Sequence, residues 1–165
     1  MRRPGLWAAV LASVLLAACA STGGGAALKP GDSRDAVQAR WGAPRGQYDL
    51  PEGGKRLLYI NQPIATETYV FDFDARDRLV RTEQSRTRER FEAAGKAQWH
   101  QSEVLRNFGL PAGRDKVERT EPARWSYRFL DNRYPRLAVL HFGTTGQVVR
   151  VEILDDSERT DDRYL

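Results

Sequence analysis

The sequence predicts an α+β protein made of two tandem repeats, each a short helix or helical pair packed on a three-stranded antiparallel sheet. Three observations lead to this fold class: an internal duplication, a short helical pattern that opens each copy, and three extended segments that follow it. The duplication relates residues 28–86 to residues 87–154 of the 165-residue chain. Self-similarity of this kind indicates repeated structural units that bury their apolar faces together.

The duplication rests on three collinear matches. They pair residues 35–44 with 102–111, 57–59 with 125–127, and 73–83 with 142–152, at offsets of 67, 68 and 69. The order is kept while the offset drifts by two residues, so we expect loops to absorb the difference.

The first copy opens with a predicted helix. Asp32 and Ser33 are both suited to cap its N-terminus, and Gly42 is suited to end it. Val37 and Trp41 lie four residues apart on one face, which predicts that both are buried.

The second copy has a less clearly marked helix start. Gln98 and His100 stand where the first copy has glycine and serine. Phe108 stands where the first copy has Trp41, so we expect these two aromatic residues to close equivalent helical faces.

Three predicted strands follow each helix, since β-branched and aromatic residues are enriched there. They lie at residues 57–60, 68–73 and 79–84 in the first copy, and at 124–130, 136–142 and 148–154 in the second. Residues 74–77 and 143–146 predict hairpin turns, with Asp77 replacing Gly146 at a left-handed position.

The N-terminus predicts export and lipid anchoring. A basic pair at residues 2–3 precedes an apolar run from Leu6 to Ala18, and the only cysteine, Cys19, follows at once. This order is typical of a secretory signal, and the run is short of the roughly 20 residues that a spanning helix needs. We therefore predict a signal peptide at residues 1–18, lipidation of Cys19, and a flexible tether over residues 19–27. A plain signal peptide with a chance cysteine is the alternative.

Charge and cysteine content narrow the function classes. Without residues 1–18 the 26 basic residues fall to 24 against 22 acidic ones, a net charge of +2. This near-balance argues against a nucleic-acid partner. With Cys19 lipidated no thiol is left for a disulfide, so a packed core must hold the fold. Residues 155–165 predict a polar tail without apolar periodicity.

The helix-and-strand order, together with the first-copy pattern Gly31-x-Ser33-x-x-x-Val37-x-x-x-x-Gly42-x-Pro44, resembles the BamE (SmpA/OmlA) family of small lipoproteins. In its doubled form it is similar to the β-lactamase inhibitor protein architecture. The resemblance covers most of residues 28–154. BamE proteins carry one such unit and belong to the machinery that inserts β-barrels into the outer membrane. The resemblance implies an outer-membrane lipoprotein facing the periplasm, whose sheet or sheet edge binds another protein.

Strand alternation predicts which residues are available to a partner. Trp125, Tyr127 and Phe129 share one side of their strand and should face the helices. The opposite side carries Arg124, Ser126, Arg128, His141, Arg150 and Glu152, and in the first repeat Asp72, Arg81 and Glu83.

We predict that Arg124, Arg128, His141 and Arg150 form a basic patch suited to an acidic protein or to lipid headgroups, with Arg81 as a further binding residue. A merely solvated sheet face is the alternative. The arginine-rich crossover at Arg81, Arg86, Arg88 and Arg90 is a second candidate, with a solvated helix as its alternative.

No enzymatic constellation is predicted. The two histidines, His100 and His141, fall on different repeats without a nearby cysteine nucleophile. Asp72 and Asp74 share one side of a strand, but acids are common at strand ends, so no metal site is predicted. The sequence has no phosphate loop, zinc spacing or nucleophile elbow, and we expect no cofactor and no small-molecule substrate.

The sequence thus predicts an outer-membrane-anchored lipoprotein that binds or scaffolds an envelope protein. The barrel-assembly machinery is one candidate for this partner. Two alternatives remain open. One is a periplasmic inhibitor of an enzyme, and the other is a structural lipoprotein that contacts lipid or peptidoglycan.

Overall fold

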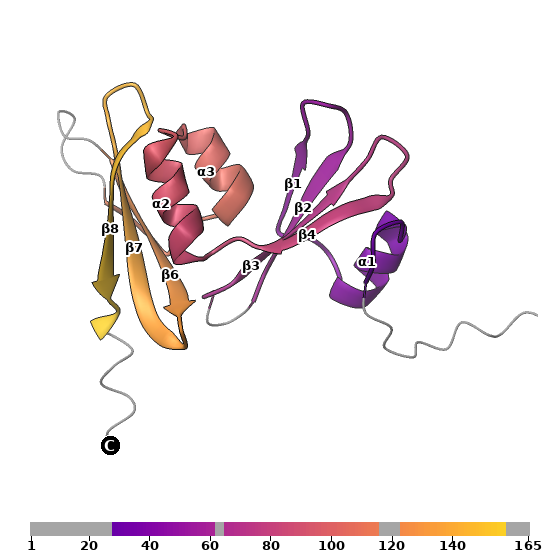
Figure 1. Cartoon of the computed structure of the whole chain (residues 1–165), viewed down its shortest axis with the longest axis horizontal. Coiled ribbons are helices and arrows are strands. Elements are labelled where there is room, and N and C mark those ends of the chain that lie inside the picture. Colours follow the sequence, from indigo (N-terminus) through magenta and orange to yellow (C-terminus); the bar gives the residue numbers. More distant parts are fainter. Residues whose placement is uncertain (1–27, 62–64, 116–122, 158–165) are drawn as a thin grey trace, which may run out of the picture.

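The computed structural model describes residues 28–61, 65–115 and 123–157 (Figure 1). The predicted signal peptide, Cys19, the predicted tether and the end of the polar tail lie outside these residues. Within them, three helices and two four-stranded antiparallel sheets confirm the predicted α+β class.

The first unit has one helix and one sheet, which we call sheet 1. Its elements are α1 (Arg34–Trp41), β1 (Gly46–Asp49), β2 (Lys55–Ile60), β3 (Thr68–Phe73) and β4 (Leu79–Gln84), with the strands in sequential order. The side chain of Ser33 caps α1 by accepting the N–H of Ala36 at 3.2 Å, and Gly42 ends the helix with a φ of +77°. Both terminal signals were predicted.

The second unit has a helical pair and a second sheet, sheet 2. Its elements are α2 (Arg88–Lys96), α3 (Gln101–Phe108), β5 (Gly113–Asp115), β6 (Arg124–Asp131), β7 (Tyr134–Phe142) and β8 (Val148–Asp155), again in sequential order. Thr87 caps α2, and the carboxylate of Glu103 accepts the backbone N–H of His100 at the start of α3.

The prediction of three strands in each sheet was wrong, because each sheet has a fourth strand at one edge. Strand β1 reads Gly-Gln-Tyr-Asp and β5 reads Gly-Arg-Asp, so neither shows apolar alternation. Their antiparallel pairing with β2 and β6 makes them strands. The six strands that were predicted are confirmed, since aromatic and β-branched residues mark them.

The two units repeat fine details of backbone geometry. Gly42 and Gly109 have nearly the same φ, +77° and +75°. The hydroxyl of Tyr59 donates to the carbonyl of Gly42, and that of Tyr127 to the carbonyl of Gly109, each at 3.1 Å. The hairpin turns are confirmed as well, with Asp77 left-handed as predicted. These shared contacts support the internal duplication.

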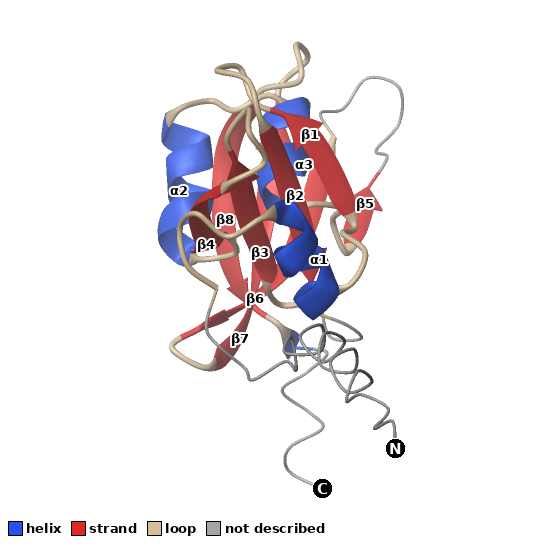
Figure 2. Ribbon diagram, turned by 90° about the vertical axis from the view of Figure 1, so that its right-hand side faces the viewer, coloured by secondary structure: helices blue, strands red, loops and turns tan. Residues whose placement is uncertain are grey.

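The layers follow one another as α1, sheet 1, the α2–α3 pair and sheet 2 (Figure 1). Figure 2, seen from the α1 side, shows α1 in front of sheet 1. The first core gathers Val37 of α1 with Leu57, Tyr59, Phe71, Phe73 and Leu79. The second core lies between the helical pair and sheet 2, around Phe91, Val104, Phe108, Tyr127 and Phe129. Helix α3 also contacts β1, β2 and β3, so sheet 1 has helices on both faces.

The expected equivalence of Trp41 and Phe108 holds for position but not for burial. Phe108 is fully buried, whereas Trp41 is 37% exposed. The ring of Phe108 lies 4.4 Å from that of Phe91 on α2, and the described residues of the first unit contain no helix equivalent to α2. Trp41 contacts the rings of Tyr59, Tyr69 and Phe71 but remains partly exposed.

Candidate protein-binding face

The face of sheet 1 that points away from α1 is covered by α3. Arg56 donates from Nε and Nη2 to the carboxylate of Asp72 at 2.7 Å each, and from Nη1 to the side-chain oxygen of Asn107 on α3 at 2.8 Å. Arg56 and Asp72 are both buried. The expectation that Asp72 is available to an external partner was therefore wrong. Its carboxylate is held by an arginine inside a contact between the two units.

Backbone carbonyls at the C-terminal end of α3 are held by the same face. The hydroxyl of Thr68 donates to the carbonyl of Phe108 at 3.0 Å, and that of Ser85 donates to the carbonyl of Asn107 at 2.7 Å. The last carbonyls of a helix have no partner inside the helix, so such donors satisfy them. Gly109 allows the close approach, since a Cβ there would lie 2.9 Å from Cδ1 of Ile60.

Two arginines of the arginine-rich crossover, Arg86 and Arg90, contact both units and do not form an exposed basic surface. Arg86 is 1% exposed, and its Nε and Nη2 donate to the carbonyl of Phe108 at 3.1 and 2.8 Å. Burial lowers the pKa of Arg86 to about 10, which leaves it protonated at neutral pH. Arg88 pairs with Asp131 at 2.7 Å.

Arg90 of the crossover lies 2.8 Å from Glu83 of sheet 1. It also donates to the side-chain oxygen of Asn107 at 3.1 Å. These contacts tie α2 to the same covered face. Arg81 of β4 pairs with Glu83 as well, and its side chain is 51% exposed at the rim of that face.

The face of sheet 2 that points away from α2 and α3 carries no described element, as Figure 1 shows. We call it the outer face of sheet 2. Its residues are Arg124, Ser126, Arg128 and Leu130 of β6, Pro135, Leu137, Val139 and His141 of β7, and Arg150, Glu152 and Leu154 of β8. Strand register places Arg124, His141 and Arg150 in one row, so three of the predicted site residues meet there. Arg128 lies on the same face, whereas Arg81 belongs to the other sheet.

Each arginine of the predicted basic patch has an acidic partner. Arg124 lies 3.4 Å from Asp115, Arg128 lies 3.1 Å from Asp156, and Arg150 pairs with Glu152. Three guanidinium groups thus face three carboxylates, so the face combines ion pairs instead of forming a purely basic patch.

Glu152 sits at the centre of this arrangement. Nε2 of His141 lies 2.8 Å from Oε2 of Glu152. This hydrogen bond is the main cause that lowers the pKa of Glu152 below its usual value, and Arg150 adds to it. The carboxylate is therefore held ionised, and it orders the side chains of β7 and β8 on the outer face.

An apolar strip runs through the same face, and we did not predict it. Leu137 and Val139 are half-buried at its centre, while Leu130 and Leu154 at its rim are 39% and 47% exposed. Part of this strip could have been predicted from the sequence, because Leu137 and Val139 in the strand at 136–142 have the same parity as His141. A sheet face with apolar residues at its centre and ion pairs around them can bury surface against a protein and orient it through charges.

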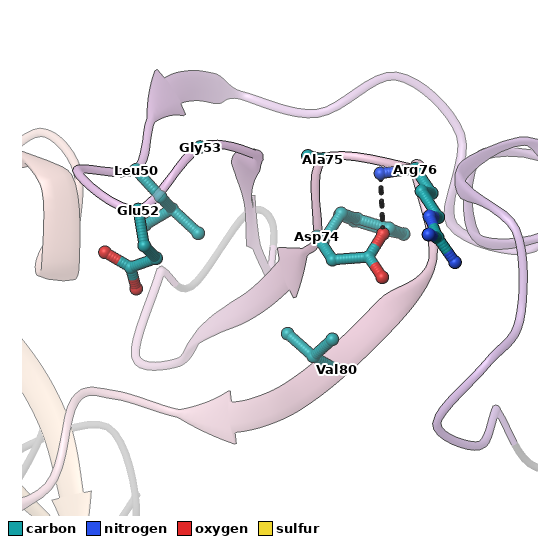
Figure 3. A pocket seen from close by; sticks show the side chains of 8 residues that line it. Leu50, Glu52, Gly53, Asp74, Ala75, Arg76 and Val80 are labelled. Atoms are coloured by element: carbon teal, nitrogen blue, oxygen red, sulfur yellow. Dashed lines mark hydrogen bonds between the residues drawn. The ribbon is translucent and has the colours of Figure 1, made fainter.

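An open hollow on sheet 1 does not form a binding site. An open hollow of about 430 Å³ lies between the β1–β2 and β3–β4 turns, lined by Leu50, Glu52, Asp74 and Arg76 among others (Figure 3). The carboxylate of Asp74 points along the turn and accepts the backbone N–H groups of Arg76 and Arg78 at 2.9 Å each. The Asp74 carboxylate therefore stabilises the β3–β4 turn.

Neither a metal cluster nor a membrane-crossing helix is found in the part of the chain that the structure describes. No group of three or more His, Cys, Asp or Glu side chains in residues 28–61, 65–115 and 123–157 is placed to hold a metal ion. Within the same ranges no helix is both long enough and apolar enough to cross a bilayer.

Comparison with known proteins adds only distant likenesses. No protein-family model matches the chain, and no curated protein matches its sequence. Among solved structures, a DUF4309 family protein, YjgB, from Bacillus subtilis is 16% identical at a TM-score of 0.30, with 75% of this chain and 78% of that one covered. An extracellular protein containing an SCP domain from Bacillus anthracis is 18% identical at a TM-score of 0.28. That match covers 76% of this chain but 44% of the other, and likenesses of this strength support no argument about function.

Proposed function

We propose that the protein is an outer-membrane-anchored periplasmic lipoprotein that binds another envelope protein through the outer face of sheet 2 and does not act as an enzyme. One observation carries this proposal. The centre of the equivalent face of sheet 1 is covered by α3, whereas the outer face of sheet 2 has the same strand order and no cover among the described residues. Val70 of the covered face is 2% exposed, and its counterpart Val139 is only half-buried.

The anchoring part of the proposal rests on the sequence. The apolar run that ends at Ala18, directly before Cys19, supports export and acylation, and Ala20 favours the outer membrane because it differs from the aspartate of retained enteric lipoproteins. Two or more acyl chains would tether the folded units stably, since each buried methylene contributes about 0.8 kcal/mol.

The resemblance to BamE supports a place in outer-membrane protein assembly. Such a role needs a tethered binding surface and no catalytic group. In the described residues His141 is held by Glu152, and His100 lies at the start of α3 on the other side of sheet 2. This arrangement favours binding over catalysis.

Site-specific photocrosslinking in intact cells tests the proposal. A photoreactive residue at Val139 or Leu137 should capture the same envelope protein, because both positions lie at the centre of the outer face. The same residue at Val80, which is 53% exposed on sheet 1, serves as the matched control. Capture of a barrel-assembly subunit would support the BamE-like role, and capture of a soluble hydrolase would support an inhibitor. Crosslinks to lipid alone, or to no protein, would overturn the proposed function.

A further inference from the structure

The β6–β7 hairpin ends in exposed apolar residues with an arginine at the turn. We infer that residues 130–135, which we call the hairpin tip, lie in the headgroup region of the bilayer that holds the lipid anchor, with Arg133 at the lipid phosphates. The inference rests on the anchoring part of the proposed function. It adds a second contact with lipid and the orientation of the two units on the membrane, whichever protein the outer face of sheet 2 binds.

Exposed apolar side chains gather at the hairpin tip. Tyr134 is 69% exposed and Leu130 is 39% exposed. Strand register pairs Leu130 with Pro135, and Leu154, which is 47% exposed, follows nearby opposite Leu137. Single exposed apolar residues are common on proteins, whereas a contiguous group marks a contact with protein or membrane. The ring and hydroxyl of a tyrosine suit the boundary between acyl chains and water.

The turn places an arginine where the backbone favours glycine. Asn132 and Arg133 form a two-residue turn with φ angles of +50° and +71°. Glycine is preferred at the second position of such a turn, because a side chain there strains the backbone. The β7–β8 turn accordingly has Gly146 at its left-handed position. Strain that is kept at an exposed tip favours a role for the Arg133 side chain outside the fold.

The charges around the tip leave this one cation in excess. Among the described residues, each carboxylate next to the tip has an arginine partner: Asp131 with Arg88, Asp155 with Arg136, and Asp156 with Arg128. No carboxylate of these residues pairs with Arg133, which is exposed. The tip therefore brings no unpaired negative charge to the headgroups, and its free guanidinium suits a phosphate oxygen.

The anchor limits how far the fold lies from the bilayer. Leu28, which packs against the first core, comes nine residues after Cys19. A chain of this length spans at most about 30 Å in any conformation. One side of the two units must therefore lie at or near the membrane surface once Cys19 is acylated.

The exposed aromatic residues indicate which side this is. Trp41 ends α1 and is 37% exposed, and its ring lies against those of Tyr59 near the end of β2 and Tyr69 near the start of β3. Figure 1 shows this end of sheet 1 and the β6–β7 turn on the same, lower side of the molecule. The β1–β2, β3–β4 and β7–β8 turns lie on the upper side. Each unit thus presents one exposed aromatic residue on the lower side, as at the interfaces of membrane proteins.

This orientation stands the strands of sheet 2 upright on the bilayer. Strand β7 rises from Tyr134 at the tip to Phe142, and a nine-residue strand is about 30 Å long. The outer face of sheet 2 is then turned sideways, so Val139 and Arg124 lie above the headgroups and remain accessible to a membrane-bound partner.

Spin labels measure the depth of the tip. The acylated chain is reconstituted in phosphatidylcholine vesicles with one added cysteine, since Cys19 is the only natural cysteine and its thiol is acylated. A nitroxide at Leu130→Cys should be accessible to oxygen, which concentrates in the bilayer, and should lose its accessibility to a water-soluble nickel chelate. Thr144→Cys is the matched control, because Thr144 is exposed in the turn at the opposite end of β7. Its label should stay accessible to the chelate.

Variants next to the label separate contact with lipid from folding. Arg133→Gly removes the guanidinium and relieves the backbone, so the melting temperature should rise while the label at residue 130 becomes more accessible to the nickel chelate. Tyr134→Ser should also increase this accessibility. Arg133→Lys keeps the positive charge and should retain most of the protection.

The outcomes separate this inference from the proposed function. Equal nickel accessibility at residues 130 and 144 would overturn the inference while the anchor and protein binding stand. Protection at residue 144 in place of residue 130 would mean the reverse orientation and would overturn it as well. Unchanged protection in Arg133→Gly would exclude a contact between Arg133 and phosphate. A chain without a fatty acid on Cys19 would overturn both the anchoring proposal and the inference.

Discussion

The two sheets carry equivalent faces in opposite states, and the difference shows what covering a face requires. On sheet 1 the ion pair of Arg56 and Asp72 is dry, bidentate and shared with α3. On sheet 2 the equivalent Arg124 lies in water beside Asp115. The same strand plan thus holds a protein helix in one unit and stays accessible in the other.

This contrast also shows that the contribution of a charged strand residue to stability depends on whether its face is covered. A buried ion pair is costly to break because the remaining charge loses both water and its partner. An exposed pair contributes little. The residues on the covered face should therefore be important for stability, and their counterparts on the outer face should be free to serve binding.

The largest expected effect is the difference in the free energy of unfolding between Arg56→Met and Arg124→Met. Arg56→Met leaves the carboxylate of Asp72 buried without its cation, so the free energy of unfolding should fall by about 3–5 kcal/mol. Arg124→Met removes a group whose side chain is 45% exposed, so the loss should stay within about 0.5 kcal/mol. Chemical denaturation of the two variants measures both values.

A double variant sharpens this first comparison. In Arg56→Met/Asp72→Met the uncompensated charge is gone, so much of the lost stability should return. Equal losses for Arg56→Met and Arg124→Met would show that the two faces do not differ in cover.

A smaller effect separates the two helix-ending glycines. Gly42 and Gly109 share a positive φ with a ψ of −156° and −158°, a region that essentially only glycine adopts, so alanine at either position should cost about 1–3 kcal/mol of backbone strain. A Cβ at Gly42 would meet nothing within 4 Å, whereas at Gly109 it would lie 2.9 Å from Ile60 of sheet 1. Gly109→Ala should therefore lose about 1–3 kcal/mol more than Gly42→Ala. Thermal and chemical unfolding of the two variants measures the difference in stability. Equal losses would mean that the end of α3 does not pack closely against sheet 1.

The sequence predicted most strands but not which face of sheet 1 is covered, and the reason is physical. Alternation shows that Arg56 and Asp72 share a parity, which reads as a polar surface. Their burial depends on Asn107, which is 51 residues away from Arg56 in the chain. A sequence pattern reports local periodicity, whereas this contact arises only when the second unit packs on the first.

A local signal for the covered face was nevertheless present. Leu57, Leu58 and Tyr59 form an unbroken apolar run in β2, which is typical of strands buried on both faces. The matching run in β6 is Trp125, Ser126 and Tyr127, where the polar Ser126 marks the uncovered side. For the outer face, alternation correctly brought Arg124, His141 and Arg150 together. It did not reveal Asp115, the acidic partner of Arg124, which comes from an unpredicted strand, or Asp156, the partner of Arg128, which follows β8.

The smallest expected effect is the acid response of the outer face. The hydrogen bond from His141 and the charge of Arg150 hold the pKa of Glu152 below its value of 4.5 in an unfolded chain. A carboxyl with a lowered pKa in the folded state adds stability that is complete above pH 4.5 and is lost as the pH falls through the lower folded value. Glu152→Gln should remove this contribution, so the unchanged chain should lose slightly more stability than the variant when the pH is lowered from 6 to 3. Chemical denaturation at several pH values in that range measures the difference. Identical slopes would show that Glu152 is not held by His141, and the central contact of the outer face would then be absent in solution.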